Sequence, residues 1–381
     1  MKCTYLVLTP FFPSNENFRG AYIYDQVKAI QENTDYLPVV VLLTTFFSKE
    51  REAYNYQGIK CLPFQVWDLP SFLFPGLFHK INAWRLSRFL FRNNVSLSSS
   101  TTIHGHVAYP AAYFASSLGK RYGSKTLAQH HGLDVYQFLT GRLAIGMLKK
   151  WQNSYIKKRT ISVLQKMSCN IGVSQKVLDE LQNEISFSNK MLVLHNGVDS
   201  KKFYFDSAIN KTAVFTIGCI GNFWKIKDQI SLLKSCRILK EKGIIDIEIK
   251  FIGSGETLFD CQEFAREHQL NCEFKTEVDN TQLNAFYNQL DLFVLPSYYE
   301  AFGCVYTEAW AAGVPFIAVE GQGIEEVMTE EMRFKQLVSK ESPEQLADKI
   351  QYFYQNKERL AFNPELDIQQ TIKTFFSKIE G

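Results

Sequence analysis

The chain has 381 residues, a length typical of two or three domains. Its composition, 46% hydrophobic and 21% charged, excludes a disordered or fibrous protein and fits an ordinary globular one. The formal net charge of +3 conceals an asymmetry. Residues 1–200 carry 22 Lys and Arg against 12 Asp and Glu, whereas residues 201–381 carry 20 against 27. This segregation indicates two domains with different partners, and it favours a polyanion or an anionic surface for the first.

The first residues and the cysteines predict a cytoplasmic protein. The stretch MKCTYLVLTP lacks the length and the cleavage site of a signal peptide. The longest apolar stretch, residues 37–47, is too short to span a bilayer. The 8 cysteines contain no C-x-x-C pair, so we expect buried free thiols rather than a zinc or redox site.

Apolar runs of strand length alternate with helical periodicity along the chain. The strands predicted in the first half are residues 4–8, 38–44, 101–104, 126–130, 170–173 and 191–195. The second half predicts strands at 214–220, 247–252, 273–275, 292–295 and 316–319, and helices at 226–242, 258–268 and 282–290. This alternation predicts two successive parallel sheets built from right-handed βαβ units. Two such sheets place a cleft near the carboxyl ends of their strands.

The most informative segment is LFVLPSYYEAFGCVYTEAWAAGVP, residues 292–315. It predicts a buried strand, a loop that presents Glu300, and a helix that begins near Gly303 and carries Glu308. The amides at a helix N-terminus favour an anion, and carboxylates accept hydrogen bonds from sugar hydroxyls. The segment therefore offers the groups that a nucleotide-sugar requires. The alternative is an ordinary α/β unit whose glutamates are only solvated.

This segment resembles the two-glutamate motif of the retaining glycosyltransferases of family four, through E-A-F-G at 300–303 and E-A-x-A-x-G-x-P at 308–315. The resemblance implies the GT-B fold, an α/β architecture of two Rossmann-like domains facing a central cleft. It also implies that Glu308 binds the ribose hydroxyls and Glu300 the transferred hexose. By the same resemblance, the backbone of Phe302, Gly303 and Cys304 meets the hexose and the diphosphate.

A second loop, IGNFWKIKD at residues 220–228, resembles the family's strand-to-helix loop. In the family, the glycine that corresponds to Gly221 is followed by an Arg and, five residues later, by a Lys, and both cations bind the diphosphate. Lys227 fits this pattern, but Asn222 stands at the Arg position and supplies no charge. Either Lys225 compensates, or diphosphate binding rests on Lys227 and the helix. The alternative for Lys227 is an ordinary exposed lysine.

The N-terminal half carries the predicted acceptor side. Gly20, in the loop after the first strand, resembles the family's glycine-containing loop, and the neighbouring Arg19 is either an acceptor contact or a surface residue. The sequence H-H-G-L-D at 130–134 resembles the family's His-Gly-x-Asp turn. The resemblance gives His131 a role near the anomeric centre, and it places His106 on the acceptor side.

Four histidines follow two successive predicted strands, which raises the alternative of a metal site: His104, His106, His130 and His131. We do not favour it, because adjacent residues on an extended backbone point in opposite directions. We expect His104 and His130 to be packing residues.

Basic and aromatic residues interleave in two acid-free stretches, residues 69–91 and 142–166. This combination is typical of a surface that docks on an anionic membrane. Nucleic acid would also accept such a face, but the acidic second half argues against it. The plainest alternative is a Phe-rich core beneath a solvated basic surface.

Together these observations predict a retaining, metal-independent hexosyltransferase that needs no cofactor. It would move a hexose from a nucleoside-diphosphate sugar to a hydroxyl of a glycan or lipid-linked acceptor in cell-surface polysaccharide biosynthesis. We expect an acceptor domain at residues 1–200, a donor domain at 201–364, and a last helix, 365–381, that packs back on the first. Asn222 keeps open a non-catalytic nucleotide-sugar-binding subunit. A Rossmann oxidoreductase is disfavoured because no G-x-G-x-x-G follows the first strand.

Overall fold

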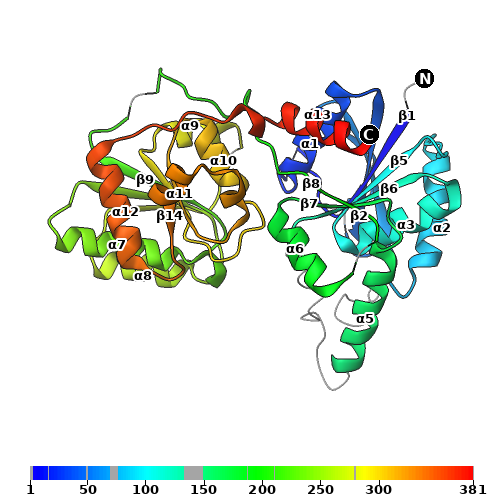
Figure 1. Ribbon diagram of the computed structural model, residues 1–381, viewed down its shortest axis with the longest axis horizontal. Helices are drawn as coiled ribbons and strands as arrows, with labels where there is room; N and C mark the ends of the chain where they lie inside the picture. The colour runs from blue at the N-terminus through cyan, green and yellow to red at the C-terminus, as the bar shows by residue number, and fades with distance from the viewer. Residues whose placement is uncertain are drawn as a thin grey trace. The chain divides into compact units, whose positions relative to one another are not determined.

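A computed structural model describes residues 3–15, 17–48, 50–68, 76–132, 149–186, 188–209, 211–278 and 280–380 (Figure 1). The chain divides into two compact units, Met1–Asn196 with Thr371–Gly381, and Gly197–Gln370. Each unit is built on a largely parallel sheet with connecting helices, so the predicted pair of Rossmann-like α/β domains is confirmed.

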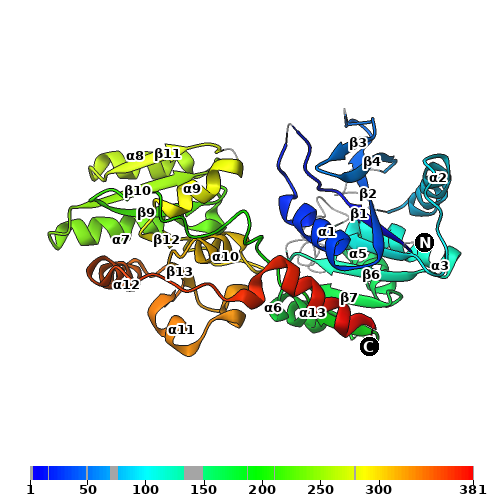
Figure 2. The same ribbon diagram turned by 90° about the horizontal axis from the view of Figure 1, so that it is seen from above.

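The described part of the first unit forms a sheet with the strand order β3-β4-β2-β1-β5-β6-β7-β8, most of which can be followed in Figure 2. Its strands are β1 (Cys3–Thr9), β2 (Tyr36–Thr45), β3 (Tyr54–Tyr56), β4 (Ile59–Val66), β5 (Thr102–His106), β6 (Lys125–His130), β7 (Cys169–Gly172) and β8 (Lys190–Val193). Its helices are α1 (Ala21–Asn33), α2 (His79–Arg92), η1 (Ala108–Ala112), α3 (Tyr113–Tyr122), α5 (Lys149–Leu164) and α6 (Gln175–Glu184).

The last helix, α13 (Ile368–Glu380), packs on this first unit. The ring of Phe376 lies 6.1 Å from that of Tyr5 on the central strand β1. Lys125 at the start of β6 donates to the carbonyl of Ile379 over 2.9 Å. The end of the chain therefore completes the core of the unit in which the chain began.

One edge of this sheet departs from the predicted parallel pattern. β3 runs antiparallel to β4, through a turn in which Gln57 and Gly58 both have positive φ. Neither strand was expected, because β3 is short and Pro63 interrupts the strand signal of β4. Pro63 nevertheless lies opposite Leu42 in a parallel pairing of β4 with β2. The same part of β4 borders a cavity.

The described residues of the second unit form a sheet in the order β11-β10-β9-β12-β13-β14. Its strands are β9 (Phe215–Ile220), β10 (Ile247–Ile252), β11 (Cys272–Lys275), β12 (Leu292–Val294), β13 (Phe316–Val319) and β14 (Leu337–Val338). Its helices are η2 (Lys225–Lys227), α7 (Gln229–Glu241), α8 (Leu258–Glu267), η3 (Asn280–Gln282), α9 (Leu283–Asn288), α10 (Cys304–Ala311), η4 (Gly323–Val327), α11 (Glu330–Gln336), α12 (Pro343–Asn356) and η5 (Pro364–Leu366).

The helix predicted over residues 226–242 is divided in two. Asp228 takes a left-handed conformation with φ +52°, so the single turn η2 ends at Lys227 and α7 begins at Gln229. The break separates the turn that carries Lys227 from the helix that packs on the sheet. Lys227 therefore sits on a tight turn beside the end of β9 rather than on a helix.

The cysteines agree with the sequence expectation in being free thiols, and most of them are buried. Cys3 is exposed, and Cys272 and Cys304 are half-buried. Within the part of the chain that the structure describes, no helix has both the length and the apolar character needed to cross a bilayer.

Candidate functional site

The loop that follows β12 is tied to the turn that follows β9 in the second unit. The Ser297 hydroxyl donates to the carbonyl of Ile226 over 3.1 Å, and the Tyr298 amide donates to the same oxygen over 3.1 Å. Ser297 is fully buried, so this junction is protected from water. It brings the two loops with the predicted donor residues to the carboxyl ends of adjacent strands, because β12 pairs with β9.

Gly303, the residue before α10, has a positive φ of +87° that favours glycine. A Cβ atom here would lie 2.5 Å from Cδ2 of Tyr306. Tyr306 is itself buried and donates from its hydroxyl to the carbonyl of Leu295 over 2.7 Å. Glycine therefore allows α10 to begin close to the end of β12. The side chain of Phe302 is buried in the core, which leaves its backbone as the part suited to a ligand.

Lys227 and Glu300 form an ion pair between these two loops. Their side chains are only 18% and 11% exposed, so the pair is largely removed from water. The Glu300 amide also donates to Oε1 of the buried Gln322 over 2.7 Å, which fixes the backbone that carries the carboxylate. Two groups predicted to touch different parts of one ligand are thus held against each other.

Glu308, on α10, accepts a hydrogen bond at Oε2 from the Tyr287 hydroxyl of α9 over 2.8 Å. Tyr287 is fully buried. Burial, and then the neighbouring Glu308 carboxylate, raises the pKa of Tyr287 well above its ordinary value. Tyr287 therefore remains a proton donor throughout the neutral range, and it orients the carboxylate predicted to bind ribose.

Asn222 is exposed in the loop that follows β9. Its carbonyl accepts from Nε2 of Gln229 over 3.0 Å. A Cβ atom on Gly253 would lie 2.1 Å from the carbonyl oxygen of Gly221, so the two loops meet backbone to backbone. Lys225 is exposed on the same turn, whereas Lys227 is the lysine that the fold turns toward Glu300.

Gly20 caps α1 in the first unit with φ +89°. A Cβ atom on it would lie 2.8 Å from the backbone of Phe11, so the loop after β1 closes on itself at this glycine. The adjacent Arg19 is exposed and lies 4.2 Å from the centroid of the Phe11 ring. This contact anchors the Arg19 guanidinium to the loop.

Three histidine rings form a continuous stack in the first unit. The rings of His104 and His106 on β5 lie 4.4 Å apart, and His131 lies 5.4 Å beyond His106. His106 Nδ1 and His131 Nε2 share a hydrogen bond of 3.2 Å. The Tyr5 hydroxyl bonds Nδ1 of His104 over 2.9 Å at the buried end, and Tyr22 packs against His131 at the other.

Burial controls the charge of this stack. It lowers the pKa of His104 to about 3 and that of His106 well below its ordinary value, with the neighbouring imidazoles acting in the same direction. Both rings are therefore neutral at pH 7. The side chain of His106 is fully buried, so its predicted acceptor role has to act through the half-buried His131.

His130 ends β6, and its Nε2 bonds Oδ1 of the buried Asn170 on β7 over 3.2 Å. His104 and His130 are both packing residues in this fold. Leu133 and Asp134 of the predicted turn lie outside the described residues. Among the residues with described positions, no group of three His, Cys, Asp or Glu side chains is arranged to hold a metal ion.

Two contacts of the site carry no signal in the sequence. Tyr287 stands 21 residues before the glutamate it orients, and Gln322 stands 22 residues after the one it supports. Both lie outside the motif at residues 300–315, and only the packing of α9 and of the turn before η4 brings them to it. By contrast, the sequence-predicted Lys227, Glu300, Gly303 and Glu308 all lie at this end of the second sheet.

Known proteins match both halves of the chain. The family model described as Glycosyltransferase Family 4 matches residues 20–202, and that described as Glycosyl transferases group 1 matches residues 200–364. The capsular polysaccharide biosynthesis glycosyltransferase CapM of Staphylococcus aureus is 30% identical over 203 residues, 48% of this chain and 50% of CapM. Protein CapJ of the same organism is 29% identical over 48% of this chain and 41% of its own. The matched stretches thus span half or less of these relatives.

Solved structures show the same fold along nearly the whole chain. Sucrose-phosphate synthase from Thermosynechococcus elongatus has a TM-score of 0.70 at 16% identity, covering 99% of this chain and 96% of its own. Anabaena HepE in complex with UDP has a TM-score of 0.67 at 13% identity, covering 99% and 95%. Two family matches that together run from residue 20 to residue 364, on this fold, establish that the chain belongs to the family-four glycosyltransferases with the GT-B fold.

Proposed function

We propose that the chain transfers a hexose from a nucleoside-diphosphate sugar to a hydroxyl of a glycan or lipid-linked acceptor, with retention at the anomeric carbon. The observation that carries this proposal is the Lys227–Glu300 ion pair beside the N-terminus of α10. The relatives support the biological setting, since CapM is named for capsular polysaccharide biosynthesis and HepE has been solved with UDP and with UDP-glucose.

Each group in the second unit has a distinct part in this proposal. The Lys227 ammonium and the first amides of α10 stabilise the charge that grows on the departing diphosphate. Glu300, released from Lys227 as the diphosphate enters, accepts hydrogen bonds from hexose hydroxyls. Glu308, oriented by Tyr287, accepts from the ribose hydroxyls. With Asn222 in place of an arginine, Lys227 carries most of the charge stabilisation.

We propose His131, supported by His106, as the group of the first unit that meets the sugar near its reacting carbon. Gly20 keeps the loop after β1 closed at the acceptor side. Retention would follow from attack on the same face as the leaving phosphate, without a protein nucleophile. Turnover would be metal-independent, because a lysine and helix amides supply the positive charge at the diphosphate.

The test begins with thermal shifts of the full chain against a panel of nucleotide-sugars. The best donor is then incubated with hydroxyl acceptors, and the anomeric configuration of the product is read by NMR. A product of retained configuration supports the proposal, together with a transfer rate that is undiminished in EDTA and at least 100-fold lower in Lys227→Met. An inverted product, or activity lost in EDTA and restored by magnesium or manganese, contradicts it. If the wild type binds the donor but turns it over no faster than Glu300→Ala does, the result would instead favour a non-catalytic binding subunit.

We further propose that the chain works at the cytoplasmic face of a membrane, held there by its basic first unit. The acid-free stretches that support this idea are only partly described, since residues 69–75 and 142–148 lie outside the described ranges. The described parts, α2 and α5, hold no acidic residue and expose Trp84 and Trp151.

A further inference from the structure

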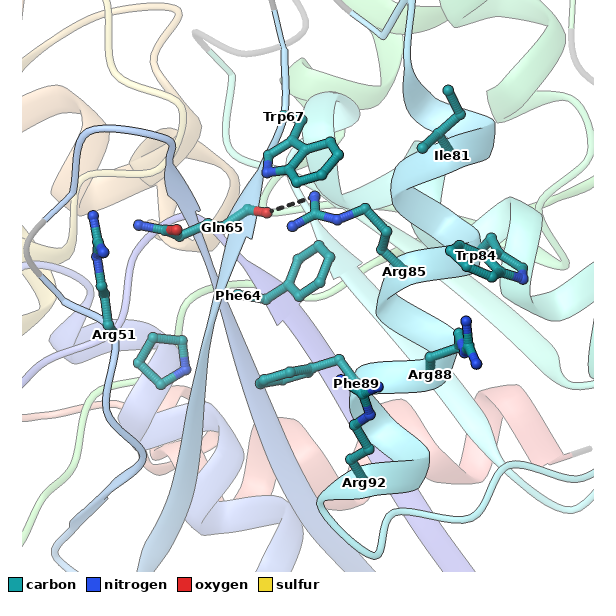
Figure 3. A pocket seen from close by; sticks show the side chains of 11 residues that line it. Arg51, Phe64, Gln65, Trp67, Ile81, Trp84, Arg85, Arg88, Phe89 and Arg92 are labelled. Atoms are coloured by element: carbon teal, nitrogen blue, oxygen red, sulfur yellow. Dashed lines mark hydrogen bonds between the residues drawn. The ribbon is translucent and has the colours of Figure 1, made fainter.

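We infer that the cavity between β4 and α2 is the surface on which the chain docks to an anionic membrane, with its arginines taking the lipid phosphates. This inference rests on the membrane association proposed above and names the site responsible for it. The cavity measures about 520 Å³ and is lined by four arginines, Arg51, Arg85, Arg88 and Arg92 (Figure 3). No carboxylate is among its lining residues.

Arg85 is a built part of the wall. Its guanidinium lies 3.6 Å from the centroid of the Trp67 ring and 5.2 Å from that of Phe64. It donates to the carbonyl of Gln65 over 3.1 Å and to Oδ1 of Asn82 over 2.8 Å. Figure 3 shows the guanidinium between the two rings. Stacking on both sides fixes its planar group, so little side-chain entropy is lost when an anion binds.

The other three arginines keep their charge available. Arg88 lies 4.7 Å from the centroid of the Trp84 ring, and Arg51 lies on the other side of β4 from α2 in Figure 3. Among the described residues, no ion pair involves Arg51, Arg88 or Arg92. The nearby acidic side chain of Asp68 accepts from the amide of Gly76 and does not line the cavity. Four cations thus line one cavity, which favours a multivalent anionic surface.

The rim of the cavity is apolar and exposed, which distinguishes a membrane from a soluble anion. On α2, Ile81 is 51% exposed and Trp84 50%, and Trp67 after β4 is 47% exposed. Large apolar side chains beside arginines suit the headgroup region, where rings bury their faces while guanidinium groups meet phosphates. A small soluble phosphate compound would leave this rim in water, so lipid is the occupant that uses both features.

The cavity runs along the edge of the first sheet, and Trp67 brings one end of it to the carboxyl ends of the parallel strands. Trp67 follows the carboxyl end of β4, which runs parallel to β2, β1, β5 and β6. His106 ends β5 and His131 follows β6 at this same end. A chain docked along this cavity would therefore meet the bilayer with Trp67 at the same end of the sheet as the acceptor-side residues.

Vesicle flotation of the full chain tests this assignment. Vesicles of phosphatidylcholine alone are compared with vesicles that also contain phosphatidylglycerol, in low and high salt. The variant Arg88→Gln/Arg92→Gln is matched by Lys120→Gln/Arg121→Gln, which removes two exposed cations from α3 of the same unit. One near-surface cation is worth about fivefold in binding, so the first variant should bind about 25-fold more weakly and the control less than fivefold.

A second pair of variants tests the rim. Ile81→Ala, at a 51% exposed site, should lower binding to the anionic vesicles about fivefold, whereas Ile245→Ala, at a 69% exposed site in the second unit, should leave it unchanged. All variants should keep the wild-type UDP thermal shift, because none of these residues lies in the donor loops. A ligand-free melting temperature equal to that of the wild type verifies that each variant is folded.

The outcomes separate the two proposals. If wild type binds the anionic vesicles and Arg88→Gln/Arg92→Gln binds equally well, this cavity is not the docking surface, although membrane association stands. If the wild type binds neutral and anionic vesicles equally, both the membrane association and the docking surface are refuted, while the proposal of donor binding is unaffected. Binding to a duplex oligonucleotide in place of vesicles would identify a nucleic-acid surface and overturn the inference.

Discussion

The Lys227–Glu300 ion pair predicts an unusual effect of Glu300→Gln. In the ligand-free unit the two charges hold each other, so a diphosphate has to displace the carboxylate before it gains the lysine. The neutral amide of Gln holds the lysine far less strongly. We therefore expect Glu300→Gln to bind a nucleoside diphosphate without sugar more tightly than the wild type does. The same variant should turn over the complete donor more slowly, because Glu300 is the proposed hexose contact.

The magnitude follows from the burial of the pair. Exposed ion pairs contribute about 0.2–1 kcal/mol, whereas breaking a fully buried pair costs about 3–5 kcal/mol. Side-chain exposures of 18% and 11% place this pair between those limits. We therefore expect the displacement of Glu300 from Lys227 to cost about 2 kcal/mol, which corresponds to a change of roughly 30-fold in the Kd for the nucleoside diphosphate.

Isothermal titration calorimetry with UDP at low salt measures this effect. The matched control is Asp348→Asn, which breaks an exposed pair with Lys242 in the same unit, with side-chain exposures of 46% and 71%, and should leave Kd unchanged. Adding Lys227→Met to Glu300→Gln should remove the gain. Equal or weaker UDP binding by a folded Glu300→Gln variant would refute the competition.

Three further predictions concern individual contacts. Tyr287→Phe removes the donor to Glu308 and should weaken donor binding by about tenfold in calorimetry, with unchanged affinity ruling out an orienting role. Gly303→Ala places a Cβ atom 2.5 Å from the Tyr306 ring at a positive φ and should lower Tm by about 4–8 °C; a Tm within 1 °C of wild type contradicts the strain. Burial lowers the pKa of His104 to about 3, so the unfolded chain binds a proton that the folded chain does not. His104 should therefore contribute stability that is full above about pH 6.5 and falls by about 1.4 kcal/mol per pH unit as pH drops toward 3, in addition to a contribution of the same sign from His106. In urea unfolding, His104→Gln should reduce the overall slope by about this amount, and an unchanged slope would exclude His104 as a source.

Local sequence patterns were sufficient to predict much of the second unit. The strands β9, β10, β12 and β13 are short apolar runs whose ends are marked by Gly, Pro or Ser, and such signals depend only on neighbouring residues. The motif at residues 300–315 likewise placed Glu300, Gly303 and Glu308 by spacing alone. The exceptions were local conformations that a single residue decides, such as the left-handed Asp228 that divides the helix predicted from residue 226.

The amino-acid sequence thus determined the α/β class, because that class is encoded in contiguous periodicity, and its motifs pointed to the family and to the loops proposed to bind the donor. Only the tertiary structure decided which side chains contact each other. It pairs Lys227 with Glu300 and Tyr287 with Glu308. It also buries His106 behind His131, which keeps the His106 ring neutral. It also decided that Arg51 and the arginines of α2 line one cavity beside the unexpected strand β4. These contacts join residues far apart in the chain, and only folding brings their charges and hydrogen-bonding groups within reach.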